Sequence, residues 1–74
     1  MLMTELEFNK LIGTNLRKYR GGTKLRQEDL ARKVGVSRSF IAQPESPNIN
    51  QGISPYILYK ISRVLNKEVD DFFV

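Results

Sequence analysis

The basic side chains of this chain are concentrated in one segment. Residues 10–38 hold nine of the twelve Lys and Arg residues and only two acids, Glu28 and Asp29, which gives this segment a net charge of +7. The rest of the chain has three basic and six acidic residues. Such a concentration of positive charge in a small domain favours a polyanionic partner, most often nucleic acid. The alternative is a solvated surface that keeps the protein soluble.

The residue types that carry out most catalytic chemistry are missing. The chain contains no His and no Cys, so it lacks an imidazole for acid–base catalysis, a thiol nucleophile, disulfides and the usual ligands of zinc. It also lacks a glycine-rich loop of the kind that holds a phosphate group. We therefore expect no enzyme activity, no catalytic residues, no metal site and no cofactor.

The length and hydropathy of the chain limit where it can act. Seventy-four residues are enough for one domain, and 41% hydrophobic and 27% charged residues are ordinary values for a globular protein. The longest uninterrupted apolar run, Tyr56 to Tyr59, is far shorter than the roughly 20 residues that a membrane-spanning helix needs. The first residues do not resemble a signal peptide. We expect one soluble, cytoplasmic domain over residues 1–74, with no membrane partner and no small-molecule substrate.

Helices must position the basic segment, because apolar residues recur at helical spacing and never alternate for long. The pair Thr4 and Glu7 resembles a capping box, and an apolar stripe follows it up to Gly21 and Gly22. The stripe consists of Phe8, Leu11, Ile12, Leu16 and Tyr19. These features predict a first helix from about Glu5 to Arg20 and an all-α fold.

Two further helices are predicted with only a tight turn between them. Apolar spacing predicts a helix from about Gln27 to Val34, and Gly35 can adopt the left-handed conformation that ends a helix. Ser37 is the predicted N-cap of the next helix and Ile41 its buried anchor. The order helix, tight turn, helix is therefore expected between residues 27 and 45.

The last part of the chain is predicted to form a loop, a helix and a short turn. Residues 44–52 are rich in Pro, Asn, Ser and Gly, which favours a loop. Ser54 can cap the following helix, with Pro55 at its first position. The apolar stripe of this helix consists of Ile57, Leu58, Ile61, Val64 and Leu65. Val69, Phe72 and Phe73 are expected in a final turn that folds back over the core.

Residues 27–43 strongly resemble the helix-turn-helix of the phage repressor and Cro family, also called the xenobiotic-response-element type. The family pattern Q-x-x-L-A-x-x-x-G-V-S-x-x-x-I is matched at every fixed position from Gln27 to Ile41. Matching residues extend over about residues 8–74. The resemblance implies a compact bundle of four to five short helices, a lambda-repressor-like domain, with the helix-turn-helix motif at about residues 27–45.

Four residues have structural roles that the resemblance implies. Ala31 is small because the two helices of the motif cross there, and Gly35 makes the turn between them. Val36 and Ile41 fill the space between the helices. Together they should hold the third helix at a fixed angle to the second.

The resemblance also implies which side chains read DNA. In the family, the third helix enters the major groove with its first turn towards the base edges. Arg38, Ser39 and Gln43 match the groove-facing positions. Arg38 can pair with guanine through two hydrogen bonds and Gln43 with adenine, and Phe40 is expected either to contact a thymine methyl group or simply to pack.

Polar residues around the third helix are expected to support it. Gln27 matches the family position at which a side chain and a helix N-terminus hold a phosphate. Arg20 and Glu45 occupy positions that often form an ion pair in the family, which ties the first helix to the end of the third. The weaker candidates for phosphate contacts are Arg17, Lys24, Arg26 and Asn48.

Three residues depart from the family pattern. Pro44 and Pro47 lie where the family usually has a large apolar residue and a helix-ending Gly, so we expect the third helix to end or kink near Gln43. Such an end or kink would weaken the assignment of Gln43 and Asn48 to DNA contacts, and of Arg20 and Glu45 to an ion pair. Arg26 replaces the usual Ser or Thr before the second helix, which predicts a weaker N-cap.

The resemblance implies a sequence-specific DNA-binding transcriptional regulator, repressor-like, encoded by a bacterium or a phage. Double-stranded DNA with a palindromic operator is the expected partner, bound by a homodimer. Phe72, Phe73 and Val74 are the expected subunit contact, unless the two Phe side chains belong to the core. The alternative function is a protein-interaction module, antitoxin-like or coactivator-like, which keeps the fold without reading DNA.

Overall fold

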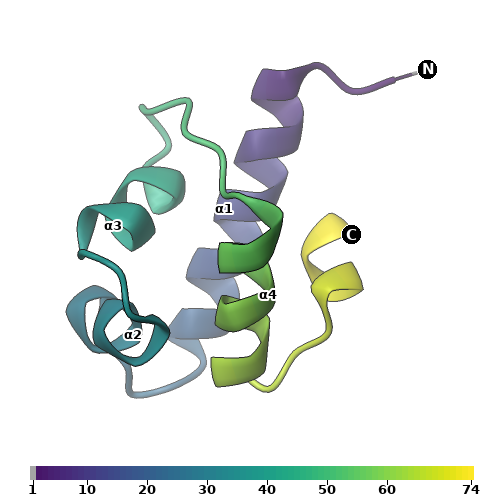
Figure 1. The fold of residues 1–74 in the computed structure, drawn as a ribbon. Coiled ribbons are helices and arrows are strands. Elements are labelled where there is room, and N and C mark those ends of the chain that lie inside the picture. The colour runs from purple at the N-terminus through teal and green to yellow at the C-terminus, as the bar shows by residue number, and fades with distance from the viewer. Residues whose placement is uncertain (1) are drawn as a thin grey trace.

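The structure, a computed structural model, describes residues 2–74 and consists of four α-helices and one short 3₁₀-helix (Figure 1). The α-helices are α1 (Glu5–Gly21), α2 (Gln27–Val34), α3 (Ser39–Glu45) and α4 (Pro55–Val64), and the 3₁₀-helix is η1 (Val69–Phe73). No β-strand occurs in the described part of the chain. The predicted all-α fold class is confirmed.

α4 lies in front of α1 near the centre of the molecule as Figure 1 shows it. α2 and α3 lie on one side of this pair and η1 lies on the other (Figure 1). α1 contacts both α3 and η1, and α2 contacts both α3 and α4. The helix-turn-helix pair is therefore held from two directions, by the first helix and by the fourth.

Local capping signals start α1 and α4 where the sequence predicts. The backbone N–H of Glu7 donates to Thr4 Oγ1 over 3.1 Å, and the N–H of Thr4 donates to Glu7 Oε1 over 2.9 Å. The backbone N–H of Thr4 first, and its side chain second, lower the pKa of the Glu7 carboxyl by hydrogen bonding to it. Ser54 Oγ accepts from the N–H of Ile57, with Pro55 at the first position of α4. Both predicted caps are confirmed.

The turn between α2 and α3 contains one left-handed residue, as predicted. Gly35 has φ 89° and ψ 33° and closes α2 through its N–H, which donates to the carbonyl of Ala31. The prediction that Ser37 is the N-cap of α3 is wrong by one residue, because Arg38 takes that position with a backbone that is already helical. The Ser37 hydroxyl instead pairs with the hydroxyl of Ser39 over 3.0 Å.

α3 passes through Pro44 and ends at Glu45, so the predicted end near Gln43 is wrong. Pro44 lies in the last turn of the helix, where its missing N–H removes only one hydrogen bond, and it is buried. The N–H of Ser46 closes the helix by donating to the carbonyl of Gln43 over 3.1 Å. Ser46 has an extended backbone, as expected for a residue that precedes a proline, so α3 ends without a left-handed residue.

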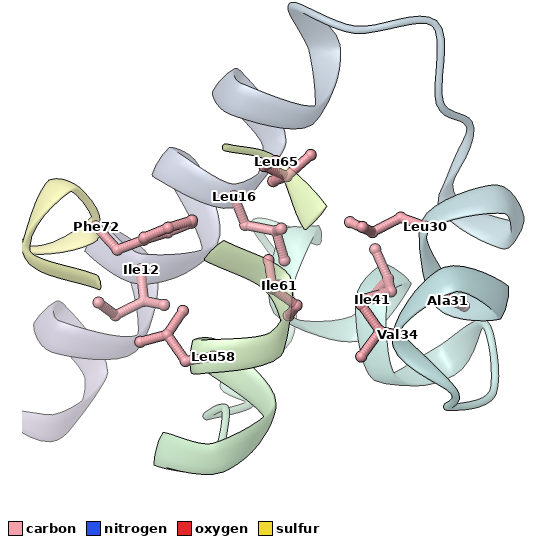
Figure 2. Packing of buried hydrophobic residues seen from close by; sticks show 10 residues of the cluster. All are labelled: Ile12, Leu16, Leu30, Ala31, Val34, Ile41, Leu58, Ile61, Leu65 and Phe72. Atoms are coloured by element: carbon pink, nitrogen blue, oxygen red, sulfur yellow. The ribbon is translucent and has the colours of Figure 1, made fainter. Parts of the chain in front are cut away.

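A single cluster of apolar side chains forms the core, with members from all four helices and η1 pointing towards one another (Figure 2). The cluster consists of Ile12, Leu16, Leu30, Ala31, Val34, Ile41, Leu58, Ile61, Leu65 and Phe72. The ring of Phe72 packs edge-on against Tyr19, with ring centroids 5.1 Å apart. Phe72 therefore belongs to the core and not to a subunit contact, whereas Phe73 and Val74 are exposed.

Two polar side chains of α1 fasten η1 to the core. The buried Asn15 side chain donates through Nδ2 to the carbonyl oxygens of Phe72 (2.8 Å) and Val74 (2.9 Å). The hydroxyl of Tyr19 donates to the carbonyl of Asp71 over 2.7 Å. These bonds satisfy carbonyl groups of a helix too short to pair them all internally.

The backbones of α1 and α3 lie against each other at Gly13. A Cβ atom at Gly13 would overlap the carbonyl oxygen of Pro44 and lie 2.9 Å from its carbonyl carbon. The chain can form this contact only because Gly13 has no side chain. The contact brings the last turn of α3 directly onto the middle of α1.

Candidate nucleic-acid interface

The outer face of α3 carries the predicted base-contacting residues. Arg38, Ser39 and Gln43 are exposed, whereas Ile41 and Pro44 on the opposite side are buried. Ser39 and Gln43 are one helical turn apart and so lie on the same face. The burial of one side of α3 against the core thus turns the other side, with its polar groups, to solvent.

Arg38 is held in place by Gln27 at the start of α2. Its Nη2 atom donates to Gln27 Oε1 over 2.9 Å. Gln27 is half-buried, and its Nε2 atom donates to Glu45 Oε1 over 3.0 Å. The amide of Gln27 therefore connects the N-terminal end of α3 with its C-terminal end.

An ion pair between α1 and α3 completes this arrangement. Arg20 donates from Nε and Nη2 to the two carboxylate oxygens of Glu45 over 2.7 and 2.8 Å, and from Nη1 to the carbonyl of Leu25 over 3.0 Å. The side chain of Arg20 is 17% exposed and that of Glu45 is 2% exposed. The hydrogen bond to Glu45 raises the pKa of Arg20. Arg20, Glu45, Gln27 and Arg38 form one connected set, which we call the polar network.

A cleft lies beside the polar network, where α1, α2 and the end of α3 meet. It has a volume of about 240 Å³ and is lined by Arg17, Arg20, Gln27, Ala42, Glu45, Ser46 and Pro47. Arg17 is exposed and forms no ion pair within residues 2–74. The structure thus brings two predicted phosphate-contacting residues, Arg17 and Gln27, to the wall of one cleft.

The other predicted phosphate contacts are more dispersed. Arg26 forms ion pairs with Glu28 (3.1 Å) and Asp29 (3.2 Å), so a phosphate would have to compete for its charge. Lys24 and Asn48 are exposed in the loops before α2 and after α3. In the described residues, no hydrogen bond joins either side chain to another predicted site residue.

The N-terminus of α2 is closed by a carboxylate, although Arg26 provides no side-chain cap. Asp29 Oδ2 accepts from the backbone N–H of Arg26 over 2.9 Å and from its side chain over 3.2 Å. Both bonds lower the pKa of Asp29, and the bond from the Arg26 side chain has the larger effect. The carboxylate therefore supports α2 at neutral pH, and this support is lost as the pH falls through the lowered pKa.

Most of the positive charge of residues 10–38 has no acidic partner. Three of the nine basic residues in this segment, Arg20, Arg26 and Arg32, form ion pairs with acids. The other six form none within residues 2–74. They are Lys10, Arg17, Lys18, Lys24, Lys33 and Arg38. The surface of α1, α2 and the start of α3 therefore remains available to an anionic partner.

Two contacts that the sequence analysis missed hold the loop after α3. Lys10 Nζ donates to the carbonyl of Pro47 over 2.6 Å, and Asn9 Nδ2 donates to Asn50 Oδ1 over 2.8 Å. They clip the loop that carries Asn48 to α1. No local pattern reveals such contacts, because their partners lie 37 and 41 positions apart.

Features typical of metalloproteins and of membrane-spanning proteins are absent from the described residues. Among residues 2–74, no cluster of three or more acidic side chains is arranged to hold a metal ion. None of the helices in this range has the length and apolar character required to cross a membrane.

Known proteins resemble this chain in sequence and in structure. A family model described as helix-turn-helix matches residues 16–72. A protein of Archaeoglobus fulgidus described as an uncharacterized HTH-type transcriptional regulator is 38% identical over 61 residues, which cover 82% of this chain and 84% of the relative. The restriction-modification controller protein C.AhdI from Aeromonas hydrophila matches with a TM-score of 0.78 and 28% identity, over 88% of this chain and 96% of its own. The hypothetical transcription factor NHTF from Neisseria has a TM-score of 0.81 and 22% identity, over 100% and 83%, which shows the fold alone.

Proposed function

Because the chain belongs to the helix-turn-helix family, we propose that it is a transcriptional regulator that reads duplex DNA with α3. The solved neighbours share its arrangement of helices, so the predicted lambda-repressor-like fold is confirmed. The family and the fold are those of transcriptional regulators. In this proposal residues 1–74 act as one DNA-binding domain without catalytic activity, in the cytoplasm, where the genome of a prokaryotic cell lies.

The placement of Arg38 is the observation that supports the proposal most. The side chain is exposed at the first turn of α3 and is held by Gln27 through one hydrogen bond. A guanidinium has five N–H donors, so Arg38 keeps enough free donors to pair with O6 and N7 of a guanine. Because the hydrogen bond to Gln27 already restricts the Arg38 side chain, this side chain loses less conformational entropy when it binds a base.

The neighbouring side chains complete the reading surface in this proposal. Gln43 has no intramolecular partner for its side chain in the described residues and is assigned to an adenine. Ser39 can donate to, or accept from, a base edge one turn earlier. α2 lies across the DNA backbone, with Arg17 and Gln27 on phosphates. The Gln27 amide gives one N–H to Glu45, which leaves its second N–H for a phosphate oxygen.

A two-fold homodimer on a palindromic operator is the assembly that we propose. Phe73 and Val74 are exposed at the C-terminal end of the described chain. The ring of Phe73 packs beside that of Phe8, which is also exposed, with centroids 5.7 Å apart. A second copy is proposed to cover this apolar surface, and a palindromic operator requires the two α3 helices of such a dimer to lie in successive major grooves, about 34 Å apart.

Titration of duplex DNA at two ionic strengths tests the proposed function. If each subunit neutralises about four phosphates, the affinity of a single subunit for random-sequence duplex should fall about 150-fold between roughly 50 and 200 mM salt, and that of a dimer about 10⁴-fold. At DNA concentrations above the dissociation constant, the same titration on a palindromic site should saturate at two chains per duplex. Absence of binding at about 50 mM salt would contradict the proposal and favour a protein-interaction module, and saturation at one chain per duplex would contradict the dimer.

A further inference from the structure

The two ends of α3 are linked through one side chain of α2. Arg38, the N-cap of α3, and Glu45, its last residue, are about two helical turns apart. The Gln27 amide spans this distance, because its Nε2 atom donates to Glu45 Oε1 over 3.0 Å and its Oε1 atom accepts from Arg38 Nη2 over 2.9 Å. These two hydrogen bonds form a relay from Glu45 to Arg38.

The carboxylate at the start of this relay is a fixed acceptor. Arg20 donates to both oxygens of Glu45 over 2.7 and 2.8 Å, and the Glu45 side chain is only 2% exposed. A rotation of the carboxylate would break bonds of the ion pair at a place where water cannot replace them, which is costly. Oε1 of Glu45 therefore stays where it meets Gln27.

This fixed acceptor determines which way the Gln27 amide points. The two ends of an amide group are similar in shape, but one end only donates hydrogen bonds and the other only accepts them. A carboxylate is an acceptor and a guanidinium is a donor, so Nε2 of Gln27 must face Glu45 and Oε1 must face Arg38. Glu45 thus keeps an acceptor turned towards Arg38.

The bond to Gln27 is the one polar contact of the Arg38 side chain within residues 2–74. This exposed side chain forms no ion pair and no second hydrogen bond in the described part of the chain. Without the Gln27 acceptor it would sample many more rotamers, and it would lose more entropy on meeting a base. The geometry of Arg38 before binding therefore depends on the orientation of the Gln27 amide.

We propose that Glu45 is a positioning residue for base recognition, which acts through Gln27 on Arg38. The inference rests on the proposed function, in which Arg38 contacts a base. It gives Glu45 a second role beside the structural ion pair with Arg20. Although Glu45 is too buried to reach a base edge, it sets how sharply the protein discriminates at the base pair that Arg38 contacts.

A double-variant cycle on DNA discrimination separates the two roles of Glu45. The quantity measured is the ratio of affinities for a selected site and for the same site changed at the base pair whose preference Arg38→Ala removes. Glu45→Gln preserves the shape of the side chain and an acceptor for Arg20, but it allows the Gln27 amide to turn over. The ratio should fall about 2- to 10-fold for each half-site, as expected for one hydrogen bond.

The second arm of the cycle removes the relay at Gln27. Gln27→Met cannot accept from Arg38, so it should lower the ratio at least as much as Glu45→Gln. Because Glu45 acts through Gln27, the double variant should lower the ratio no further than Gln27→Met alone. A purely structural role of Glu45 would instead give losses that add.

Two more variants keep the test decisive. Glu28→Gln makes the same change at an exposed carboxylate, which pairs only with Arg26, and should leave the ratio unchanged. Glu45→Asp retains the charge beside Arg20 but withdraws the acceptor from Gln27, and it replaces Glu45→Gln if that variant does not fold. A wild-type ratio in a folded Glu45 variant, or additive losses in the double variant, would overturn this inference alone. Failure of the wild type to bind any duplex would overturn the proposed function as well.

Discussion

Replacement of Gly13 by Ala is expected to destabilise the fold by about 3 kcal/mol or more, which corresponds to a fall in Tm of about 12 to 24 °C. The new Cβ would overlap the carbonyl oxygen of Pro44. The position of the Cβ is fixed by the backbone of α1, and the carbonyl oxygen belongs to the backbone of α3. No side-chain rotation can therefore relieve the overlap, and α1 and α3 must separate. A domain of this size has a total stability of only roughly 4 to 11 kcal/mol. Thermal unfolding followed by circular dichroism measures the effect.

Gly21→Ala provides the matched control, because it makes the same substitution in the same helix. A Cβ at Gly21 has no atom within 4 Å. Ala is a better helix former than Gly, so this variant should be as stable as the wild type or more stable by up to about 1 kcal/mol. If both variants unfolded at the same temperature, the close backbone contact between α1 and α3 would be wrong.

Removal of the Glu45 carboxylate is expected to have the largest effect of any change in the polar network. Glu45→Ala leaves the largely buried Arg20 guanidinium without its charged partner and removes the acceptor of Gln27. Breaking a buried ion pair in this way costs about 3 to 5 kcal/mol. Arg20 can reach solvent through the adjoining cleft, which favours the lower end of this range. Denaturant unfolding provides the measurement.

Two comparisons distinguish this loss from a general effect of removing a carboxylate. Glu28→Ala breaks only an exposed pair with Arg26 and should change stability by about 0.5 kcal/mol or less. The double variant Arg20→Met with Glu45→Met replaces the ion pair by apolar side chains and should recover most of the loss. Equal effects of Glu45→Ala and Glu28→Ala would show that the polar network does not stabilise the domain.

The features predicted correctly from the sequence are those that depend on neighbouring residues. The capping box of Thr4 and Glu7, the left-handed Gly35 and the cap at Ser54 are all local signals. The apolar stripes identified most of the core for the same reason, because helical spacing determines which residues share a face. The bounds of α1 and α2 and the start of α4 followed from these two kinds of signal, whereas the two ends of α3 did not.

Features that depend on how the helices dock were missed. The rule that Pro ends a helix predicted too short an α3, because it takes no account of the packing of Pro44 against α1. An isolated Gly in a helical pattern is a signal of close packing, so Gly13 could have been recognised, but not its partner. The bond from Arg38 to Gln27 depends on side-chain geometry across the turn and has no sequence signature.

The central claim, that α3 reads base sequence from its first turn, is tested most directly by selecting duplexes from a random pool with three proteins in parallel. The wild type should enrich a two-fold symmetric motif. Arg38→Ala should lose the preference at one base pair of each half-site, with the ratio of specific to non-specific affinity reduced about 5- to 150-fold. Arg32→Ala, an equally basic and exposed position on α2, should enrich the wild-type motif. A folded Arg38→Ala protein that selects the same motif with an unchanged ratio would contradict the account.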